Sequence, residues 1–251
     1  MVAALSLVVP GLGLLAAMTA LWRIGVVLHQ RADSSQTTGE SYVLSGAFGL
    51  LALLMAFAFS LAIGRYETRR LLVVEEANAI GTMGTRLALL EDGQRKSLTA
   101  VLAHYAKGRA AVGKNAGDEA WQAAHDASAR ECATFGDALF ATLRSMPPDT
   151  RGPMLVQAYN AMCDITTERH AARSARLPSE VLALLALYCC ACTALLGFTT
   201  GRSDQRSAVS AVLFFTLLAA AYVTILDLDS PRSGAIIVPQ EELDKVAQSL
   251  G

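Results

Sequence analysis

Cys189, Cys190 and Cys192 form a Cys-Cys-x-Cys cluster, a residue pattern that can bind a metal ion. On a helix, however, these side chains point around the axis instead of toward one ion, and no histidine is near. The cluster also lies in an apolar segment that oxidising solvent does not reach. We therefore interpret all five cysteines, Cys132 and Cys163 included, as small apolar packing residues. No metal site is predicted.

The other residues capable of catalysis do not form a recognisable constellation. The four histidines, His29, His104, His125 and His170, are scattered, and each is interpreted as a surface or packing residue. The sequence has no nucleophile paired with a base and no glycine-rich phosphate loop. We therefore predict neither an enzyme nor a bound cofactor. The net charge of −1 gives no indication of nucleic-acid binding.

The densest polar signal is the stretch 69–90, which has two different faces if it is helical. A polar face carries Glu75, Asn78, Thr82 and either Thr85 or Arg86. The other face is a stripe of small residues on which a second helix could pack closely: Ala77, Gly81, Gly84 and Ala88. The polar face is either a solvated surface with ion pairs between helices or a path for a ligand or ion.

The chain that positions these polar residues is unusually apolar, with 53% hydrophobic and 17% charged residues. Four segments contain no Asp, Glu, Lys or Arg: residues 5–21, 43–63, 181–199 and 208–226. Each has about 17 to 21 residues, enough as a helix to cross a hydrocarbon layer of ~30 Å. Backbone groups in a bilayer must be satisfied within the segment, so all four are expected to be helices.

The first apolar segment has a second interpretation. Small residues such as Ala17 and Ala20 follow an apolar run, as in a cleaved signal peptide. No Lys or Arg precedes the segment, however, which favours an uncleaved anchor.

Arginines near the ends of the segments indicate an orientation. One side has the larger group, Arg65, Arg69, Arg70, Arg169, Arg173, Arg176 and Arg232, and the other has Arg23, Arg31, Arg202 and Arg206. We therefore expect both termini and the polar region between the second and third segments in the cytoplasm of a multi-pass protein.

The predicted architecture is an all-α membrane protein with four transmembrane helices and a cytoplasmic helical bundle inserted between the second and third. The second span continues without a proline into the polar region, so one helix is expected to run to about Leu90. The expected parts are a first transmembrane pair (1–63), a cytoplasmic helical region (64–178), a second transmembrane pair (179–228) and a cytoplasmic C-terminal tail (229–251).

Three stretches, 69–82, 169–178 and 226–234, resemble the bacterial bestrophin-like family of membrane proteins. The resemblance spans most of the chain. The cytoplasmic motif comprises Arg69, Arg70, Glu75, Glu76, Asn78, Thr82 and Arg86, and the membrane-exit motif comprises Asp227, Asp229 and Pro231.

This resemblance implies a fold and a function. Bestrophins are pentameric anion channels whose second helix lines the pore, with an apolar constriction at every fourth residue ahead of an arginine. Taking Arg65 as that arginine implies a pore-lining and gating stripe at Gly49, Leu53 and Phe57. On helical spacing alone, the same stripe is a packing or lipid-facing surface. No calcium site is predicted, because Asp227 and Asp229 lack a ligand-rich loop.

Two functions remain. The first is a homo-oligomeric channel, a pentamer by resemblance, in a bacterial inner membrane, which passes small inorganic ions and in particular anions. The second is a non-conducting membrane scaffold or sensor whose cytoplasmic helical bundle binds a partner.

Overall fold

The computed structural model describes residues 2–31, 38–113, 118–201, 205–231 and 234–251, without the side chains of 2–7, 38–40, 118 and 205–207. Within these ranges every regular element is a helix, which confirms the predicted all-α class. The helices are α1 (Val2–Arg31), α2 (Thr38–Leu87), α3 (Asp92–Val112), α4 (Asp118–Ser145), α5 (Arg151–Ser174), α6 (Ser179–Thr200), α7 (Gln205–Asp229) and α8 (Glu241–Ser249). The side chains of Arg202, Arg206 and Arg232, used above to predict orientation, lie outside the described residues.

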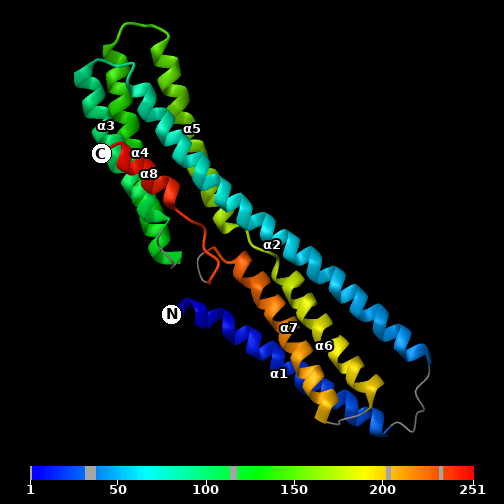
Figure 1. The fold of residues 1–251 in the computed structure, drawn as a ribbon. Helices are drawn as coiled ribbons and strands as arrows, with labels where there is room; N and C mark the ends of the chain where they lie inside the picture. The colour runs from blue at the N-terminus through cyan, green and yellow to red at the C-terminus, as the bar shows by residue number, and fades with distance from the viewer. Residues whose placement is uncertain (1, 32–37, 114–117, 202–204, 232–233) are drawn as a thin grey trace. The chain divides into compact units, whose positions relative to one another are not determined.

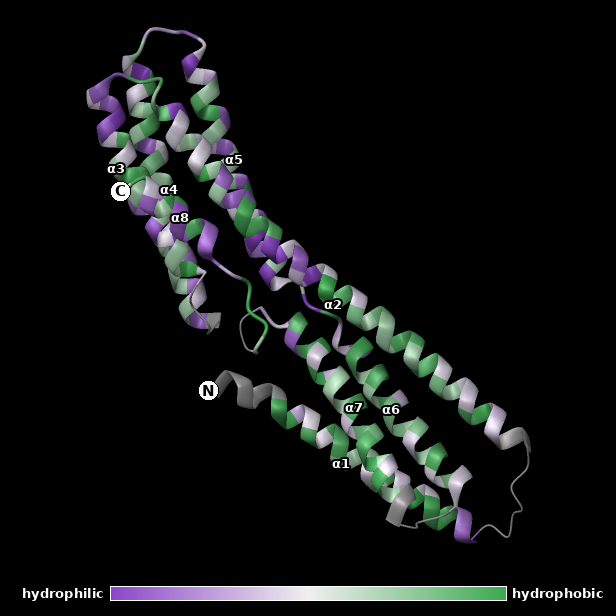
Figure 2. Ribbon diagram, in the orientation of Figure 1, coloured by the Kyte–Doolittle hydropathy of each residue, from purple (hydrophilic) through white to green (hydrophobic). Residues whose placement is uncertain are grey.

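Four helical stretches are long and apolar enough to cross a membrane, as predicted. They are Val8–Arg31, Ser41–Leu87, Arg151–Thr200 and Ala208–Asp229. Figure 2 shows apolar residues along α1, α6, α7 and the first part of α2, and polar residues along α3, α4, α5 and α8. The protein is therefore an integral membrane protein.

The chain forms two compact units. The membrane unit comprises Met1–Arg65 and Arg176–Ile236, and the polar unit comprises Tyr66–Ala175 and Ile237–Gly251. Helix α2 contributes residues to both units, whereas α8 belongs to the polar unit although it comes last in the chain.

In the membrane unit, α1 packs against α6 and α7 (Figure 1). Two glycines allow the backbones of α1 and α6 to approach closely. A Cβ atom on Gly25 would lie 2.2 Å from the Ala194 carbonyl oxygen, and one on Gly197 would lie 2.1 Å from that of Trp22. Small residues at a helix contact are the usual way to pack helices in lipid, where apolar burial gives little driving force.

The polar unit has an apolar core of the kind found in water-soluble helical bundles. Its largest buried side chains include Phe135 and Leu139 of α4, Leu102 and Tyr105 of α3, and Ile80 of α2. In Figure 1, α8 lies beside α3. This core holds the polar parts of α2 to α5 in fixed positions.

The predicted end of the second helix was close to the observed one. Helix α2 ends at Leu87, and the next residues continue in a tighter turn, with the amides of Ala88, Leu89 and Leu90 each donating to the carbonyl three residues earlier. Such bonds commonly tighten the last turn of a helix. Helix α3 then begins at Asp92.

Candidate functional site

The residues of the predicted cytoplasmic motif do not form one cluster. Arg69 and Glu76 are buried, whereas the remaining five are exposed or half-buried: Arg70, Glu75, Asn78, Thr82 and Arg86. Helical geometry explains the division, because α2 turns one face into the polar unit's core and the other to the surface. The motif therefore has a structural half and a surface half.

The structural half centres on Glu76, whose side chain has no exposed surface. Its carboxylate forms ion pairs with Arg109 of α3 and with Arg169 of α5. The Thr166 hydroxyl lies 3.5 Å from Glu76 Oε1 and 3.1 Å from the hydroxyl of Tyr105. We call these five residues the Glu76 network. It joins α2, α3 and α5 inside the polar unit.

The Glu76 network places one carboxylate against two guanidinium groups, and Arg109 is only 2% exposed. Arg169 also donates from Nη2 to Gln240 Oε1 at 3.1 Å, just before α8. Burial raises the pKa of the Tyr105 phenol, so its hydroxyl stays protonated and able to donate. Breaking a buried pair of this kind leaves a charge uncompensated.

Arg69, the other buried motif residue, caps the C-terminus of α5. Its Nε donates to the Ala172 carbonyl at 3.1 Å, and its Nη2 donates to the Ala175 carbonyl at 2.8 Å. The last carbonyls of a helix have no hydrogen-bond donors within the helix and carry partial negative charge. The Arg69 guanidinium supplies both the donors and a positive charge.

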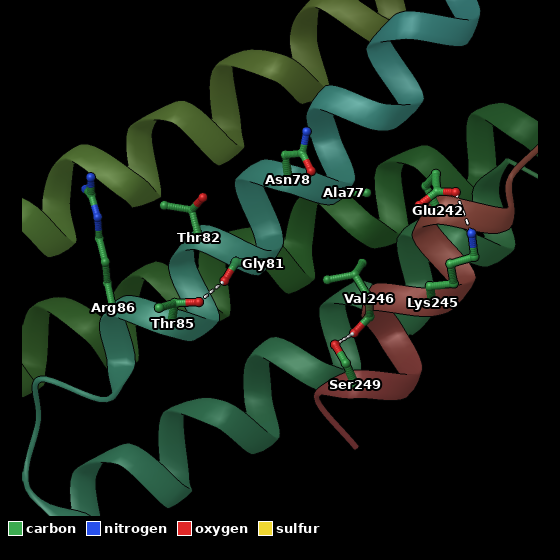
Figure 3. Close-up of a pocket in the computed structure, with 10 residues that line it drawn as sticks. All are labelled: Ala77, Asn78, Gly81, Thr82, Thr85, Arg86, Glu242, Lys245, Val246 and Ser249. Atoms are coloured by element: carbon green, nitrogen blue, oxygen red, sulfur yellow. Dashed lines mark hydrogen bonds and ion pairs between the residues drawn. The ribbon is translucent and has the colours of Figure 1, made fainter.

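Three residues of the surface half, Asn78, Thr82 and Arg86, line a groove of about 760 Å³ between α2 and α8. Figure 3 shows Asn78, Thr82 and Arg86 on α2 along one wall and α8 along the other, with Val246 toward Gly81. A Cβ atom on Gly81 would lie 3.6 Å from Val246 Cγ2, so α8 packs on the small-residue stripe as predicted. Ala88, at the end of that stripe, is exposed.

Polar groups from two helices reach the groove. Lys245 and Glu242 form an ion pair at 2.7 Å on α8. Arg86 donates to the Met154 carbonyl and to Gln157 Oε1, which lies at 3.4 Å. The groove thus combines polar groups of the motif and of the last helix with an apolar lining that includes Ala77 and Val246.

In the membrane unit, the three stripe residues of α2 are exposed. Leu53 is 51% exposed, Phe57 is 61% exposed, and a Cβ atom on Gly49 would meet nothing within 4 Å. The buried residues of this part of α2, Leu51, Ala58 and Ala62, lie on about the opposite side of the helix. The stripe therefore faces away from the membrane unit's own core.

The membrane-exit motif holds the end of α7. Asp229 Oδ1 accepts a hydrogen bond from the Leu177 amide at 2.9 Å, and Asp227 Oδ2 accepts one from the Ala235 amide at 3.1 Å. Both aspartates and Pro231 are buried. Carboxylates fixed by backbone amides in this way act as structural anchors.

Two pairs of side chains that the sequence separates are brought together by α4 and α5. The sulfur atoms of Cys132 and Cys163 are 3.2 Å apart. The rings of His125 and His170 stack with centroids 4.7 Å apart, and both contact Trp121. The interpretation of all four histidines as scattered was therefore wrong for this pair, because antiparallel packing aligns residues distant in sequence.

The His125 and His170 stack lies in a cationic environment. Burial, and next the Arg109 and His170 charges, lower the pKa of His125, which favours the neutral ring. The Arg173 guanidinium lies 4.6 Å from the Trp121 ring centroid. Among the described residues, no group of three His, Cys, Asp or Glu side chains could hold a metal ion.

Sequence reasoning missed the buried ion pairs of Arg109 and Arg169 with Glu76, although a signal was present. On α3, Arg109 continues the buried series Leu98, Leu102 and Tyr105 at helical spacing. On α5, Arg169 follows Ile165 by one turn. A basic residue that continues an apolar helix face indicates a buried charge with a partner.

Comparison with known proteins identifies the family. The family model for the Bestrophin-like domain matches residues 11–243. No relative matches among curated protein sequences.

Solved structures of low sequence identity share the fold. A bacterial bestrophin homologue from Klebsiella pneumoniae has a TM-score of 0.72 at 14% identity, covering 97% of each chain. A substituted form of that homologue has a TM-score of 0.75 at 13% identity, covering 98% of this chain and 97% of its own. Because the family model spans nearly the whole sequence, the chain belongs to the Bestrophin-like family.

Proposed function

We propose that the chain assembles into a homo-oligomeric membrane channel for small anions, with α2 of each subunit around the pore. In this proposal the polar unit lies in the cytoplasm, together with both termini, and the membrane is the bacterial inner membrane. The pentameric state is carried over from the resemblance to bestrophins.

The observation that carries the proposal is the exposed stripe of α2. Gly49, Leu53 and Phe57 lie opposite the face that packs in the membrane unit, so they are free to meet other subunits around a central axis. The segment 43–63 contains no charged residue that would fix an ion in place. An apolar ring of such stripes gates by wetting and dewetting.

The arginines support the cytoplasmic position of the polar unit. Arg65 and Arg70 follow the apolar part of α2, and Arg176 precedes α6. An excess of cationic residues beside membrane spans favours the cytoplasmic side.

The test compares two phenylalanines of α2 on different faces. Phe57 belongs to the stripe, whereas Phe59, also exposed, does not. Phe57→Ala is expected to raise chloride efflux from reconstituted vesicles several-fold, because a smaller side chain eases wetting of the constriction. Phe59→Ala is expected to leave efflux unchanged. With a potassium chloride gradient across the membrane, the reversal potential of the current is expected near the equilibrium potential of chloride.

Three results would each contradict one part of the proposal. Vesicles that stay impermeable with wild type and Phe57→Ala would exclude conduction. Equal increases for Phe57→Ala and Phe59→Ala would remove the special role of the stripe. A reversal potential near that of potassium would overturn the anion assignment while leaving the channel.

A scaffold or sensor is the second candidate, favoured by the groove between α2 and α8. Asn78, Thr82, Arg86 and Lys245 line this groove, so they offer polar groups to a partner. This function would be favoured over the channel if the vesicles are impermeable and a partner that binds the wild-type protein no longer binds Arg86→Ala.

A further inference from the structure

The α4 and α5 helices align their facing residues in a regular antiparallel register. Gly136 of α4 contacts Tyr159 of α5. Cys132, four residues before Gly136, contacts Cys163, four residues after Tyr159. Seven residues further in the same directions, His125 stacks on His170. The cysteine contact therefore follows from the packing of the two helices and is not an isolated approach of two side chains.

The geometry of the pair is close to that of a disulfide. Both cysteines are free thiols, and their sulfur atoms are 3.2 Å apart. A disulfide has sulfurs ~2.05 Å apart, so a shift of about 1 Å closes the bond. Gly136 keeps the helices close here, since a Cβ atom on it would lie 2.4 Å from the Tyr159 hydroxyl oxygen.

The two thiols differ in environment. Cys163 is half-buried, whereas Cys132 is buried beside Tyr105 and Arg109. Hydrogen bonds from Cys132 and from the Tyr159 hydroxyl lower the pKa of Cys163 to about 7. The pKa of Cys132 is raised, first because its thiol donates a hydrogen bond to Cys163 and second because it is buried. Cys163 is thus the nucleophile and Cys132 the second, resolving thiol.

We propose that Cys132 and Cys163 are a redox-sensing pair that forms a reversible disulfide between α4 and α5 when the protein meets a peroxide. The Cys163 thiolate attacks one peroxide oxygen, the O–O bond breaks, and the other oxygen leaves as hydroxide and takes a proton to become water. The Cys163 sulfenic acid then reacts with the Cys132 thiol, forming the S–S bond and releasing a second water. The peroxide is reduced and the two thiols are oxidised.

The disulfide acts on the core of the polar unit. Cys132 neighbours Tyr105 and Arg109, both members of the Glu76 network. Closing the bond fixes α4 to α5 beside this network. A cross-link over 31 positions also restricts the unfolded chain, and the thermal midpoint is expected to rise by about 5 °C. Because a cytosolic environment keeps thiols reduced, the disulfide would form only while an oxidant is present.

The test uses the full chain in detergent and does not depend on conduction. The protein is treated with a small excess of hydrogen peroxide, free thiols are blocked with N-ethylmaleimide, and peptides are analysed by mass spectrometry. We expect a cross-linked peptide containing Cys132 and Cys163, lighter by two hydrogen atoms and reversed by dithiothreitol. Cys190, half-buried on α6, is the internal control: its thiol is expected to survive the peroxide and to be alkylated afterwards.

Two isosteric variants separate the roles. Cys132→Ser is expected to abolish the cross-link and leave a Cys163 sulfenic acid that dimedone traps. Cys163→Ser is expected to leave Cys132 as a free thiol. Full alkylation of both wild-type cysteines after peroxide, oxidation of Cys190 at the same rate, or a cross-link only between subunits would overturn the proposal. The wild-type peptide map decides the matter even if a variant fails to fold.

Discussion

The membrane unit and the polar unit are both helical, but they use polar groups in opposite ways. Among the described residues, the buried acidic side chains of the membrane unit are Asp227 and Asp229, and both accept hydrogen bonds from backbone amides. In the polar unit, Glu76 is paired with two arginines from different helices. The membrane unit is held by close backbone packing, and the polar unit by an apolar core around an ion network.

This difference follows from the surroundings of each unit. Lipid is as apolar as leucine, so the membrane unit gains little by burying large side chains and leaves many exposed, Phe57 and Leu53 among them. The polar unit buries its large apolar residues, as a protein in water does. The two units should therefore fail under different substitutions.

The largest effect is expected in the membrane unit from Gly197→Val. A Cβ atom there would lie 2.1 Å from the Trp22 carbonyl oxygen, and backbone cannot move aside as a side chain can. We expect a loss of more than about 3 kcal/mol and little monodisperse protein by size-exclusion chromatography. The control is Gly46→Val, where a Cβ atom meets nothing within 4 Å. Equal yields for both variants would refute close packing as the basis of this unit.

A large effect is expected in the polar unit from Glu76→Gln. The change leaves Arg109 and Arg169 buried without a counter-charge, which costs about 3–5 kcal/mol. Glu75→Gln, one position earlier and exposed, is the matched control and is expected to cost less than about 0.5 kcal/mol. Thermal unfolding of the full chain in detergent measures both. A Glu76→Gln protein as stable as the control would show that the network contributes nothing.

A smaller effect is expected from Asp229→Ala in the membrane unit. The buried Leu177 amide loses its acceptor, at a cost of about 1–3 kcal/mol. Asp229→Asn keeps a carbonyl oxygen at that position and is expected to lose less. If the asparagine variant were the less stable of the two, the carboxylate would not act through this hydrogen bond.

The smallest effect concerns reactivity only. Hydrogen bonds lower the pKa of the Cys163 thiol to about 7, so its thiolate forms at lower pH than that of an ordinary cysteine. Alkylation by iodoacetamide is therefore expected to be half-maximal near pH 7. Gly136→Ala displaces the Tyr159 hydroxyl and should shift this midpoint upward. An unshifted midpoint near that of a free thiol in both proteins would contradict the assignment of Cys163 as nucleophile.

The helices could be predicted from the sequence, but the division of the motif could not. Charge-free segments of membrane length located the four membrane-spanning stretches, in α1, α2, α6 and α7, because this signal is local. Glu75 and Glu76 are identical in type and adjacent, yet one is exposed and the other buried. Their difference depends on Arg109 and Arg169, which lie 33 and 93 positions from Glu76 and meet it only after folding.

The cysteine and histidine contacts were missed for the same reason. Cys132 and Cys163 are 31 positions apart, and their contact requires the register between α4 and α5. The stripe on α2 was predicted from a family resemblance, and its three residues are exposed in the membrane unit.

A single-particle structure of the full chain in detergent tests the central claim most directly. We expect a ring of subunits with α2 around a central axis and with Gly49, Leu53 and Phe57 facing that axis. A monomer, a compact dimer without a central opening, or a ring in which this stripe faces the surrounding detergent would contradict the proposed channel.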